Sequence, residues 1–158
     1  MAQVLVIYYS QSGNTKKMAE EITRGIKEEG VDAVLKDVID TRADELLKYD
    51  GIVIGSPTYY GTMAFQVKKL LDETVKFHGK LEGKVGAAFA SSANIAGGNE
   101  TTILDIINAM LIHGMVIQGD PQGDHYGPVS IGAPDSRALK NCLRLGGRIA
   151  RLVKRCTV

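Results

Sequence analysis

The sequence predicts an α/β fold, a doubly wound parallel sheet of five strands with helices on both faces. Short apolar runs alternate with amphipathic helical patterns along the chain, as in parallel sheets that are covered on both sides. The connections between successive runs are long enough for right-handed crossovers. With 158 residues and a hydrophobic composition of 44%, the chain fits one globular domain. We therefore expect a single domain over residues 1–158.

The predicted strands are the short apolar runs. The run at 31–38 alternates between apolar and polar residues, which is typical of a strand near the edge of a sheet. The run Ile52-Val53-Ile54 is wholly apolar and predicts a buried strand. The five strands are expected at residues 4–9, 31–38, 52–54, 84–90 and 115–117.

The predicted helices carry apolar residues three and four positions apart. In the first of them, Met18, Ile22 and Ile26 recur at a spacing of four, and Gly30 is the type of residue that ends a helix. One short helical turn is expected at 43–47, after the second strand. The four helices are expected at residues 16–29, 64–76, 100–112 and 136–155.

The composition limits the partners and the compartment. A formal charge of +1 gives no reason to expect nucleic acid as a partner. No apolar run approaches the roughly 20 residues of a membrane span, and the chain enters a strand almost at once, so we expect neither integral membrane association nor a signal peptide. The two cysteines, Cys142 and Cys156, lack the partners of a zinc site, and no metal is predicted. So few cysteines suggest a reducing compartment, and we expect a cytoplasmic protein.

Three loops at strand ends form the candidate site, and the first of them joins the first strand to the first helix. The first amides of a helix lack internal partners and lie at the positive end of its dipole, so such a turn can bind phosphate. The pattern matches neither a Walker A loop nor a dinucleotide fingerprint. The alternative is an ordinary turn that Asn14 or Thr15 caps. The candidate phosphate-binding residues are Ser10, Gln11, Ser12, Gly13, Asn14 and Thr15.

The second and third loops follow the third and fourth predicted strands, and in a doubly wound sheet they should converge with the first. The second loop holds two adjacent tyrosines, which suit contact with a flat aromatic ligand or, alternatively, form a packed surface pair. The third loop is rich in free amides that could bond the polar edge of a heterocycle, or it is a plain connector. The candidate ligand-binding residues are Pro57, Thr58, Tyr59, Tyr60, Gly61, Ser91, Ser92, Ala93, Asn94, Gly97 and Gly98.

A phosphate-binding loop, a loop with two adjacent tyrosines and an amide-rich loop together indicate a site for a mononucleotide with a large flat ring. On these motifs, and over almost all of its length, the chain resembles the flavodoxin-like flavoproteins. It is most similar to the WrbA-type NAD(P)H:quinone oxidoreductases, with further marks at 97–102, 113–117 and 125–127. The resemblance implies the strand order 2-1-3-4-5, FMN as cofactor, NAD(P)H as co-substrate and a quinone or other small electron acceptor. It also implies a homo-oligomer, either a dimer or a tetramer.

Two residues outside the three loops are catalytic candidates. His113 matches a histidine of the family that lies by the flavin; the alternative is a histidine at a helix C-terminus, followed by the cap Gly114. Tyr126 lies beside His125 in a loop rich in proline and glycine, at 119–134, which could close over the flavin of its own or a neighbouring subunit.

The charge pattern favours a two-electron enzyme. The segments 56–63 and 91–99 contain no Asp or Glu, so an anionic reduced flavin would meet little like-charge repulsion there. We therefore expect an NAD(P)H:quinone oxidoreductase. The alternative is a flavodoxin-type carrier that moves single electrons between redox partners. One departure from the family is in the third loop, where Ala93 and Ala96 stand at positions expected to be glycine.

The last predicted helix carries a stripe of basic residues at spacings of three and four. Such a stripe is usually a solvated face. The alternative is a docking surface for an acidic partner or an anionic lipid. The stripe consists of Arg137, Lys140, Arg144, Arg148, Arg151 and Arg155.

Overall fold

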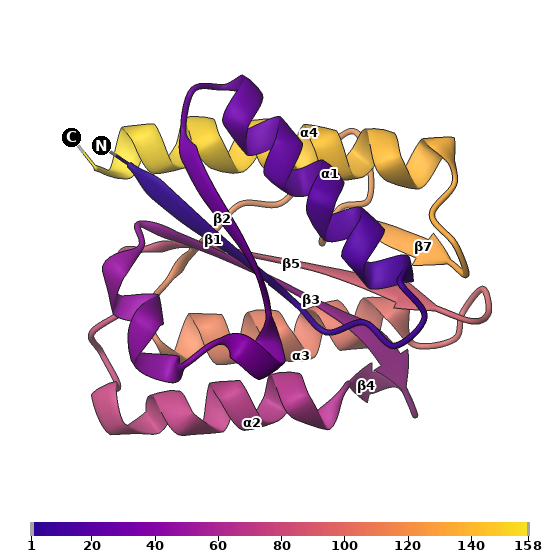
Figure 1. Cartoon of the computed structure of the whole chain (residues 1–158), viewed down its shortest axis with the longest axis horizontal. Helices are drawn as coiled ribbons and strands as arrows, with labels where there is room; N and C mark the ends of the chain where they lie inside the picture. Colours follow the sequence, from indigo (N-terminus) through magenta and orange to yellow (C-terminus); the bar gives the residue numbers. More distant parts are fainter. Residues whose placement is uncertain (1, 158) are drawn as a thin grey trace.

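A computed structural model describes residues 2–157 of the chain and contains the predicted parallel sheet (Figure 1). The order of the hydrogen-bonded strands is β2-β1-β3-β5-β6, and all four of these pairings are parallel. This is the predicted order 2-1-3-4-5 once the five predicted strands are numbered in sequence. The strands are β1 (Gln3–Tyr8), β2 (Asp32–Asp37), β3 (Gly51–Tyr59), β4 (Thr62–Met63), β5 (Val85–Ser92), β6 (Val116–Ile117) and β7 (Val129–Ile131).

The helices cover the sheet in two pairs, α1 with α4 on one face and α2 with α3 on the other (Figure 1). Successive residues of β1 lie on opposite faces of the sheet. Leu5 and Ile7 belong to the core under α2 and α3, and Val4 and Val6 belong to the core under α1 and α4. The helices are α1 (Asn14–Glu28), α2 (Phe65–Glu73), α3 (Asn99–Ile112) and α4 (Ser136–Cys156), with the 3-10 turns η1 (Val38–Asp40), η2 (Ala43–Lys48) and η3 (Thr74–Phe77).

The apolar periodicity of α1 is confirmed, because Met18, Ile22 and Ile26 are all completely buried. This helix crosses α4 with the two backbones in close contact. A Cβ atom at Gly146 would lie 2.2 Å from the carbonyl oxygen of Ile22, and one at Gly25 would be equally crowded. Glycines at this crossing therefore fix how closely α1, which begins at the first candidate loop, lies to α4.

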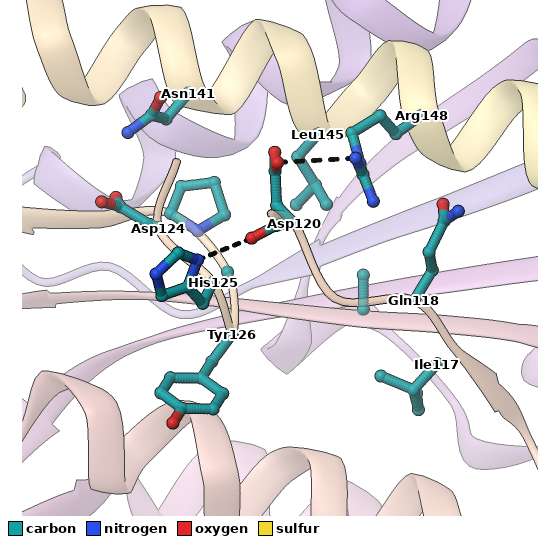
Figure 2. Close-up of a pocket in the computed structure, with 12 residues that line it drawn as sticks. Ile117, Gln118, Asp120, Asp124, His125, Tyr126, Asn141, Leu145 and Arg148 are labelled. Atoms are coloured by element: carbon teal, nitrogen blue, oxygen red, sulfur yellow. Dashed lines mark hydrogen bonds and ion pairs between the residues drawn. The ribbon is translucent and has the colours of Figure 1, made fainter. Parts of the chain in front are cut away.

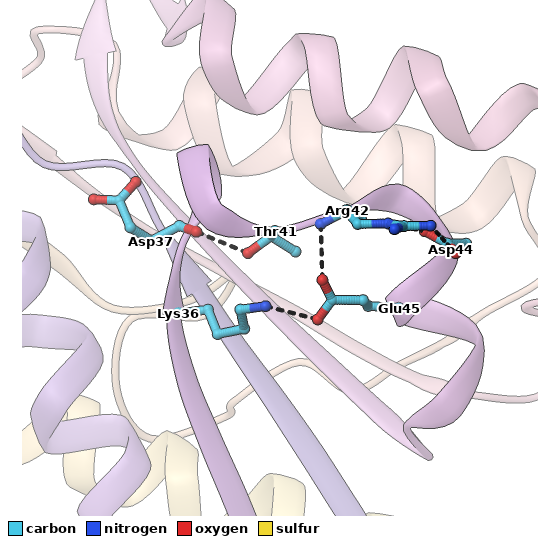
Figure 3. Close-up of polar contacts among 6 residues, drawn as sticks. All are labelled: Lys36, Asp37, Thr41, Arg42, Asp44 and Glu45. Atoms are coloured by element: carbon cyan, nitrogen blue, oxygen red, sulfur yellow. Dashed lines mark hydrogen bonds and ion pairs between the residues drawn. The ribbon is translucent and has the colours of Figure 1, made fainter.

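A compact network of polar contacts stabilises the segment that connects β2 to β3 (Figure 3). The Lys36 ammonium lies 2.7 Å from the Glu45 carboxylate, and the second oxygen of that carboxylate accepts from the backbone N–H of Arg42 at 3.2 Å. The hydroxyl of Thr41 donates to the backbone carbonyl of Asp37 at 2.7 Å. The helical turn predicted at 43–47 forms here, as the 3-10 turn η2.

Four elements differ from the prediction, and one of them is the two-residue strand β4, which was not predicted. The third strand does not end at residue 54 but continues to Tyr59, so most of the second candidate loop belongs to β3. The predicted helix 64–76 is a shorter α2 followed by η3. The strand β7 was not predicted, because it is only three residues long and follows a loop rich in proline and glycine. It pairs in parallel with the end of β5.

The two cysteines differ in their surroundings. Cys142 lies in the core between α4 and the sheet, where burial raises the pKa of its thiol to about 12, and Cys156 is exposed. No helix within residues 2–157 is both long and apolar enough to cross a membrane.

Candidate functional site

The three candidate loops meet at the carboxyl edge of the sheet, because they leave the neighbouring strands β1, β3 and β5. Side chains join the first loop to both of the others. The Tyr59 hydroxyl donates to the Gln11 side-chain oxygen at 3.0 Å. The hydroxyls of Thr15 and Ser91 hydrogen-bond at 2.9 Å in a buried position. The first loop is thus held between the other two.

Direct contacts also join the second loop to the third. The hydroxyls of Thr58 and Thr102, the latter in the first turn of α3, hydrogen-bond at 3.0 Å, and Thr101 donates to the backbone carbonyl of Gly61. The backbones also approach closely, since a Cβ atom at Gly98 would lie 2.6 Å from the Cα atom of Gly61. The loops therefore form one preorganised unit rather than three independent connectors.

The first loop leaves the start of α1 open. Gly13 is the N-cap residue with φ +91°, and within the described chain no side chain caps this helix. The alternative of a cap from Asn14 or Thr15 is therefore wrong; Thr15 instead bonds Ser91. The Ser10 hydroxyl accepts from the Gly13 amide at 3.0 Å, which orders the turn. Uncapped first-turn amides and a positive dipole end suit a phosphate group.

The second loop is a tight hairpin between β3 and β4. Its two central residues, Tyr60 and Gly61, have φ +50° and +78°, the signs of a type I′ turn. This turn leaves the Tyr60 ring fully exposed, whereas Tyr59 is 38% exposed and bonded to Gln11. The two tyrosines therefore do not form a packed surface pair, and the Tyr60 ring is accessible to a ligand.

The third loop begins with the last residues of β5 and ends at α3. The Asn99 side chain donates to the Ser92 hydroxyl at 3.1 Å, and that hydroxyl donates to the backbone carbonyl of Asn94 at 2.9 Å. Ala96 has φ +53°, which explains why glycine is expected at this position. Gly98, with φ +98°, begins α3, and no side chain of the described residues caps that helix. A second helix N-terminus with free amides thus faces the loops.

Tyr126 lies between the outer edge of β5 and the first turns of α3. It lines a cavity of about 180 Å³ together with Glu100 and Ile103 of α3 and Val129 of β7. The chain before β7 runs along the end of β5, where the Ala90 amide donates to the Pro128 carbonyl at 3.1 Å. The structure therefore brings Tyr126 next to the first turns of α3, the helix that follows the third loop.

His113 does not lie at the carboxyl edge of the sheet, and within one chain the structure does not bring this catalytic candidate together with the three loops. It caps the C-terminus of α3, which runs about 21 Å away from the third loop. Its Nε2 atom hydrogen-bonds the Thr74 hydroxyl at 2.7 Å, and Gly114 follows with φ +77°. Burial, with a smaller effect of His78, lowers the pKa of the His113 imidazole. The alternative of a helix C-terminal histidine describes it correctly.

The basic stripe on α4 is partly engaged in ion pairs within the chain: Arg137, Arg144, Arg148 and Arg151 each contact a carboxylate, whereas Lys140 and Arg155 are exposed and pair with none of the described residues. Arg144 bonds both oxygens of Asp120, at 2.7 and 3.0 Å, and Arg148 lies 3.5 Å from the same carboxylate (Figure 2). These contacts, with Arg144 first among them, lower the pKa of Asp120 to about 2. Further along the stripe, Arg137 lies 2.8 Å from Asp124. The stripe thus holds the 119–128 segment against α4.

Sequence reasoning missed the side chains that tie the loops together. Thr101 and Thr102 lie in the first turn of α3, where threonine gives no signal of a contact with a hairpin 40 residues earlier. The bond between Tyr59 and Gln11 joins two predicted site residues, but nothing in the sequence pairs them. Only the predicted convergence of the strand ends could have suggested these contacts.

Comparisons with known proteins agree with this architecture. A family model described as "Flavodoxin" matches residues 6–101. The chain is 34% identical to the "NAD(P)H dehydrogenase (quinone)" of Archaeoglobus fulgidus, with 98% of this chain and 99% of that protein covered. It is 38% identical to the "Flavodoxin" of Aquifex aeolicus, with 97% and 88% covered. Among solved structures, the WrbA-like protein from Agrobacterium tumefaciens superposes with a TM-score of 0.83 at 26% identity, covering 98% and 99% of the two chains. The chain belongs to the flavodoxin family.

Proposed function

We propose that the chain binds FMN at the three loops and transfers two electrons from NAD(P)H to a quinone or similar small acceptor. The observation that supports the proposal most strongly is the uncapped start of α1. Hydrogen bonds join the loop before this helix to the second loop, which bears the aromatic rings, and to the third loop, which bears free amides. FMN, when bound, supplies hydride chemistry, and the protein supplies binding and orientation.

Each part of the site fits a part of FMN. The amides at the start of α1 and the hydroxyls of Ser10 and Ser12 would hold the terminal phosphate. Tyr59 and Tyr60 would contact the flat ring, since one is half-exposed and the other fully exposed. The backbone of the third loop, between Ala93 and Gly98, would bond the polar edge of the ring. Tyr126 lines a cavity with Glu100, two residues after this loop, where a bound acceptor could contact it.

The charges around the site favour an enzyme over a carrier. The hairpin and the third loop bear no carboxylate, and the first one after them is the exposed Glu100. A reduced anionic ring would therefore meet little repulsion, and the amides of the third loop would stabilise it. Several relatives named "NAD(P)H dehydrogenase (quinone)" at 34–41% identity also support this function.

One finding favours a second candidate, a carrier of single electrons. The Aquifex aeolicus relative, at 38% identity over nearly the whole chain, is named "Flavodoxin". A protein of this kind would depend on redox partner proteins and would not oxidise NAD(P)H by itself.

Steady-state kinetics test the proposed function. The purified chain, loaded with FMN, is expected to oxidise NADH or NADPH when benzoquinone is present, with parallel lines in double-reciprocal plots because donor and acceptor use the same flavin face in turn. The same protein without FMN serves as the control. NAD(P)H oxidation that needs an added reductase would contradict the proposal and favour the carrier.

We also propose that the chain forms a homo-oligomer. Tyr60 exposes apolar surface at the hairpin, and Phe65, at the start of α2, lines a cavity of about 620 Å³ together with the exposed Val75 and Ile112. Exposed apolar patches of this kind often mark interfaces. Met63, in contrast, is buried and does not contribute. Light scattering at micromolar concentration is expected to give the mass of a dimer or tetramer, and a monomeric mass with full quinone reductase activity would contradict this.

A further inference from the structure

A cavity of about 230 Å³ lies between α2 and the segment that follows β2. None of the residues that line it belongs to the three candidate loops, so it is separate from the proposed flavin site. The lining residues of α2 are three and four positions apart and share one face of the helix. The cavity is lined by Val38, Ile39 and Thr41 of the segment after β2 and by Gln66, Lys69, Leu70 and Glu73 of α2.

The segment after β2 forms an ordered apolar wall of this cavity. The Asp37 carboxylate accepts from the Ile39 amide at 3.0 Å, and the Thr41 hydroxyl donates to the Asp37 carbonyl at 2.7 Å (Figure 3). The Ile39 side chain is nevertheless 70% exposed, whereas Val38 and Leu70 are buried. An exposed isoleucine on an ordered segment offers apolar surface to a flat ring without a large cost in ordering.

Gln66, near the start of α2, brings an unsatisfied polar group to the cavity. Its Oε1 atom is buried and accepts no hydrogen bond from the described part of the chain. Such an oxygen is costly and calls for a partner. The side chain as a whole is only half-buried, so its terminal amide can turn toward the cavity, where a ligand N–H would satisfy the oxygen. The amide N–H groups would then be available to an acceptor of the same ligand.

Among the described residues, one cation and one anion line the cavity. Lys69 and Glu73 pair with each other along α2, with 68% and 44% of their side chains exposed. An exposed pair of this kind contributes little to stability, so both groups can turn toward a ligand at small cost. The ammonium group suits a phosphate, and the carboxylate suits the hydroxyl groups of a sugar.

We propose that this cavity binds the adenine base of a nucleotide. An amide side chain pairs with adenine by accepting from the N6 amino group and donating to N7, which is the pairing that Gln66 offers. Ile39 covers the face of the ring, and Lys69 and Glu73 contact the phosphate and the ribose. The same chemistry is present in the adenosine half of NAD(P)H and in free adenine nucleotides such as ADP.

Calorimetric titration of the FMN-loaded full chain with ADP tests the site, because bound FMN keeps ADP out of the three loops. Gln66→Met keeps the length of the side chain but removes the amide, and it should weaken ADP binding by about 5- to 150-fold. Inosine diphosphate has an oxygen in place of the amino group. It should bind the wild type more weakly than ADP does, and Gln66→Met should remove this difference.

Gln3→Met is the matched control, because Gln3 is exposed at the start of β1, at the opposite edge of the sheet. It should bind ADP as the wild type does. Ile39→Ser removes the apolar wall at an exposed position, where the fold is not at risk, and should also weaken ADP binding. Equal ADP affinities in the wild type and Gln66→Met would overturn the proposal, and so would the absence of ADP binding at millimolar concentration.

Kinetics with two hydride donors identify the source of the adenine. NADH carries an adenosine half, and reduced nicotinamide mononucleotide does not. If the site holds the adenosine of the co-substrate, Gln66→Met should raise the KM for NADH and leave the KM for the mononucleotide unchanged. Unchanged KM values for both donors, with weaker ADP binding, assign the site to a free adenine nucleotide. If the wild type oxidises neither donor while ADP binding still depends on Gln66, the proposed function is wrong and the adenine site stands.

Discussion

Replacing Gly98 with alanine is expected to abolish measurable FMN binding and to lower the free energy of unfolding by about 2–4 kcal/mol. The alanine Cβ would lie 2.6 Å from the Cα atom of Gly61, a separation that forces the hairpin and the third loop apart. It would also occupy φ +98°, a conformation that side-chain-bearing residues rarely adopt. Both effects act where the second and third loops meet. The tyrosine rings of one loop and the free amides of the other would then no longer keep the relative positions that FMN binding requires.

Gly79→Ala separates these two effects. Gly79 has a similar φ of +82°, but a Cβ atom there would meet no atom of the described chain within 4 Å. This variant should lose about 1–2 kcal/mol of stability and keep its FMN affinity. Fluorescence titration of FMN and urea unfolding measure the two quantities. Wild-type FMN affinity in Gly98→Ala would show that the contact between the loops does not shape the site.

Removing the two buried or half-buried hydroxyls of the phosphate loop should have the second largest effect. Thr15→Val keeps the shape of a buried side chain but removes its bond to Ser91, and Ser10→Ala removes the acceptor that orders Gly13. Ser10→Ala should weaken FMN binding by about 10- to 150-fold, because a hydrogen bond to a charged phosphate contributes about 1.5–3 kcal/mol. Thr15→Val should weaken it by about 2- to 13-fold, because the bond to Ser91 that positions the loop is a neutral one and contributes about 0.5–1.5 kcal/mol. The affinity for riboflavin, which lacks the phosphate, should change much less.

Thr23→Val is the matched control for Thr15→Val. Thr23 is another buried threonine of α1, but its hydroxyl donates to the Ala19 carbonyl at 2.8 Å, within the helix and away from the loops. Its FMN dissociation constant should equal that of the wild type. Equal losses of FMN and riboflavin affinity in the Thr15 and Ser10 variants would mean that the first loop does not hold a phosphate.

The features that local pattern encodes could be predicted from the sequence. Within residues 2–157, five of the seven strands and all four helices follow from apolar runs and helical spacing, because burial of alternate faces imposes those patterns, whereas the order of the strands was implied by the family resemblance. The first candidate loop was also found, since its glycine and hydroxyl residues follow a strand directly. The convergence of the three loops follows from the order of the strands.

The features that depend on contacts between distant segments could not be predicted. The approach of Gly98 to Gly61 and the bond between Thr102 and Thr58 join residues about 40 positions apart, without any periodic signal. The prediction placed His113 beside the flavin on the family resemblance alone, although the direction of its helix places it elsewhere within one chain. A helix that begins at the carboxyl edge of a parallel sheet ends at the opposite edge, so its last residues cannot reach a site beside its first.

Anaerobic titration of the FMN-loaded protein tests the central claim most directly. Reductant is added in small steps, and the absorbance spectrum follows the oxidised, one-electron-reduced and fully reduced flavin. Because the site bears no carboxylate on the hairpin or the third loop, the fully reduced anion should be stable. The account predicts direct conversion to the fully reduced flavin with only a trace of the one-electron form. Accumulation of the one-electron form through much of the titration would contradict it and assign the chain to the electron carriers.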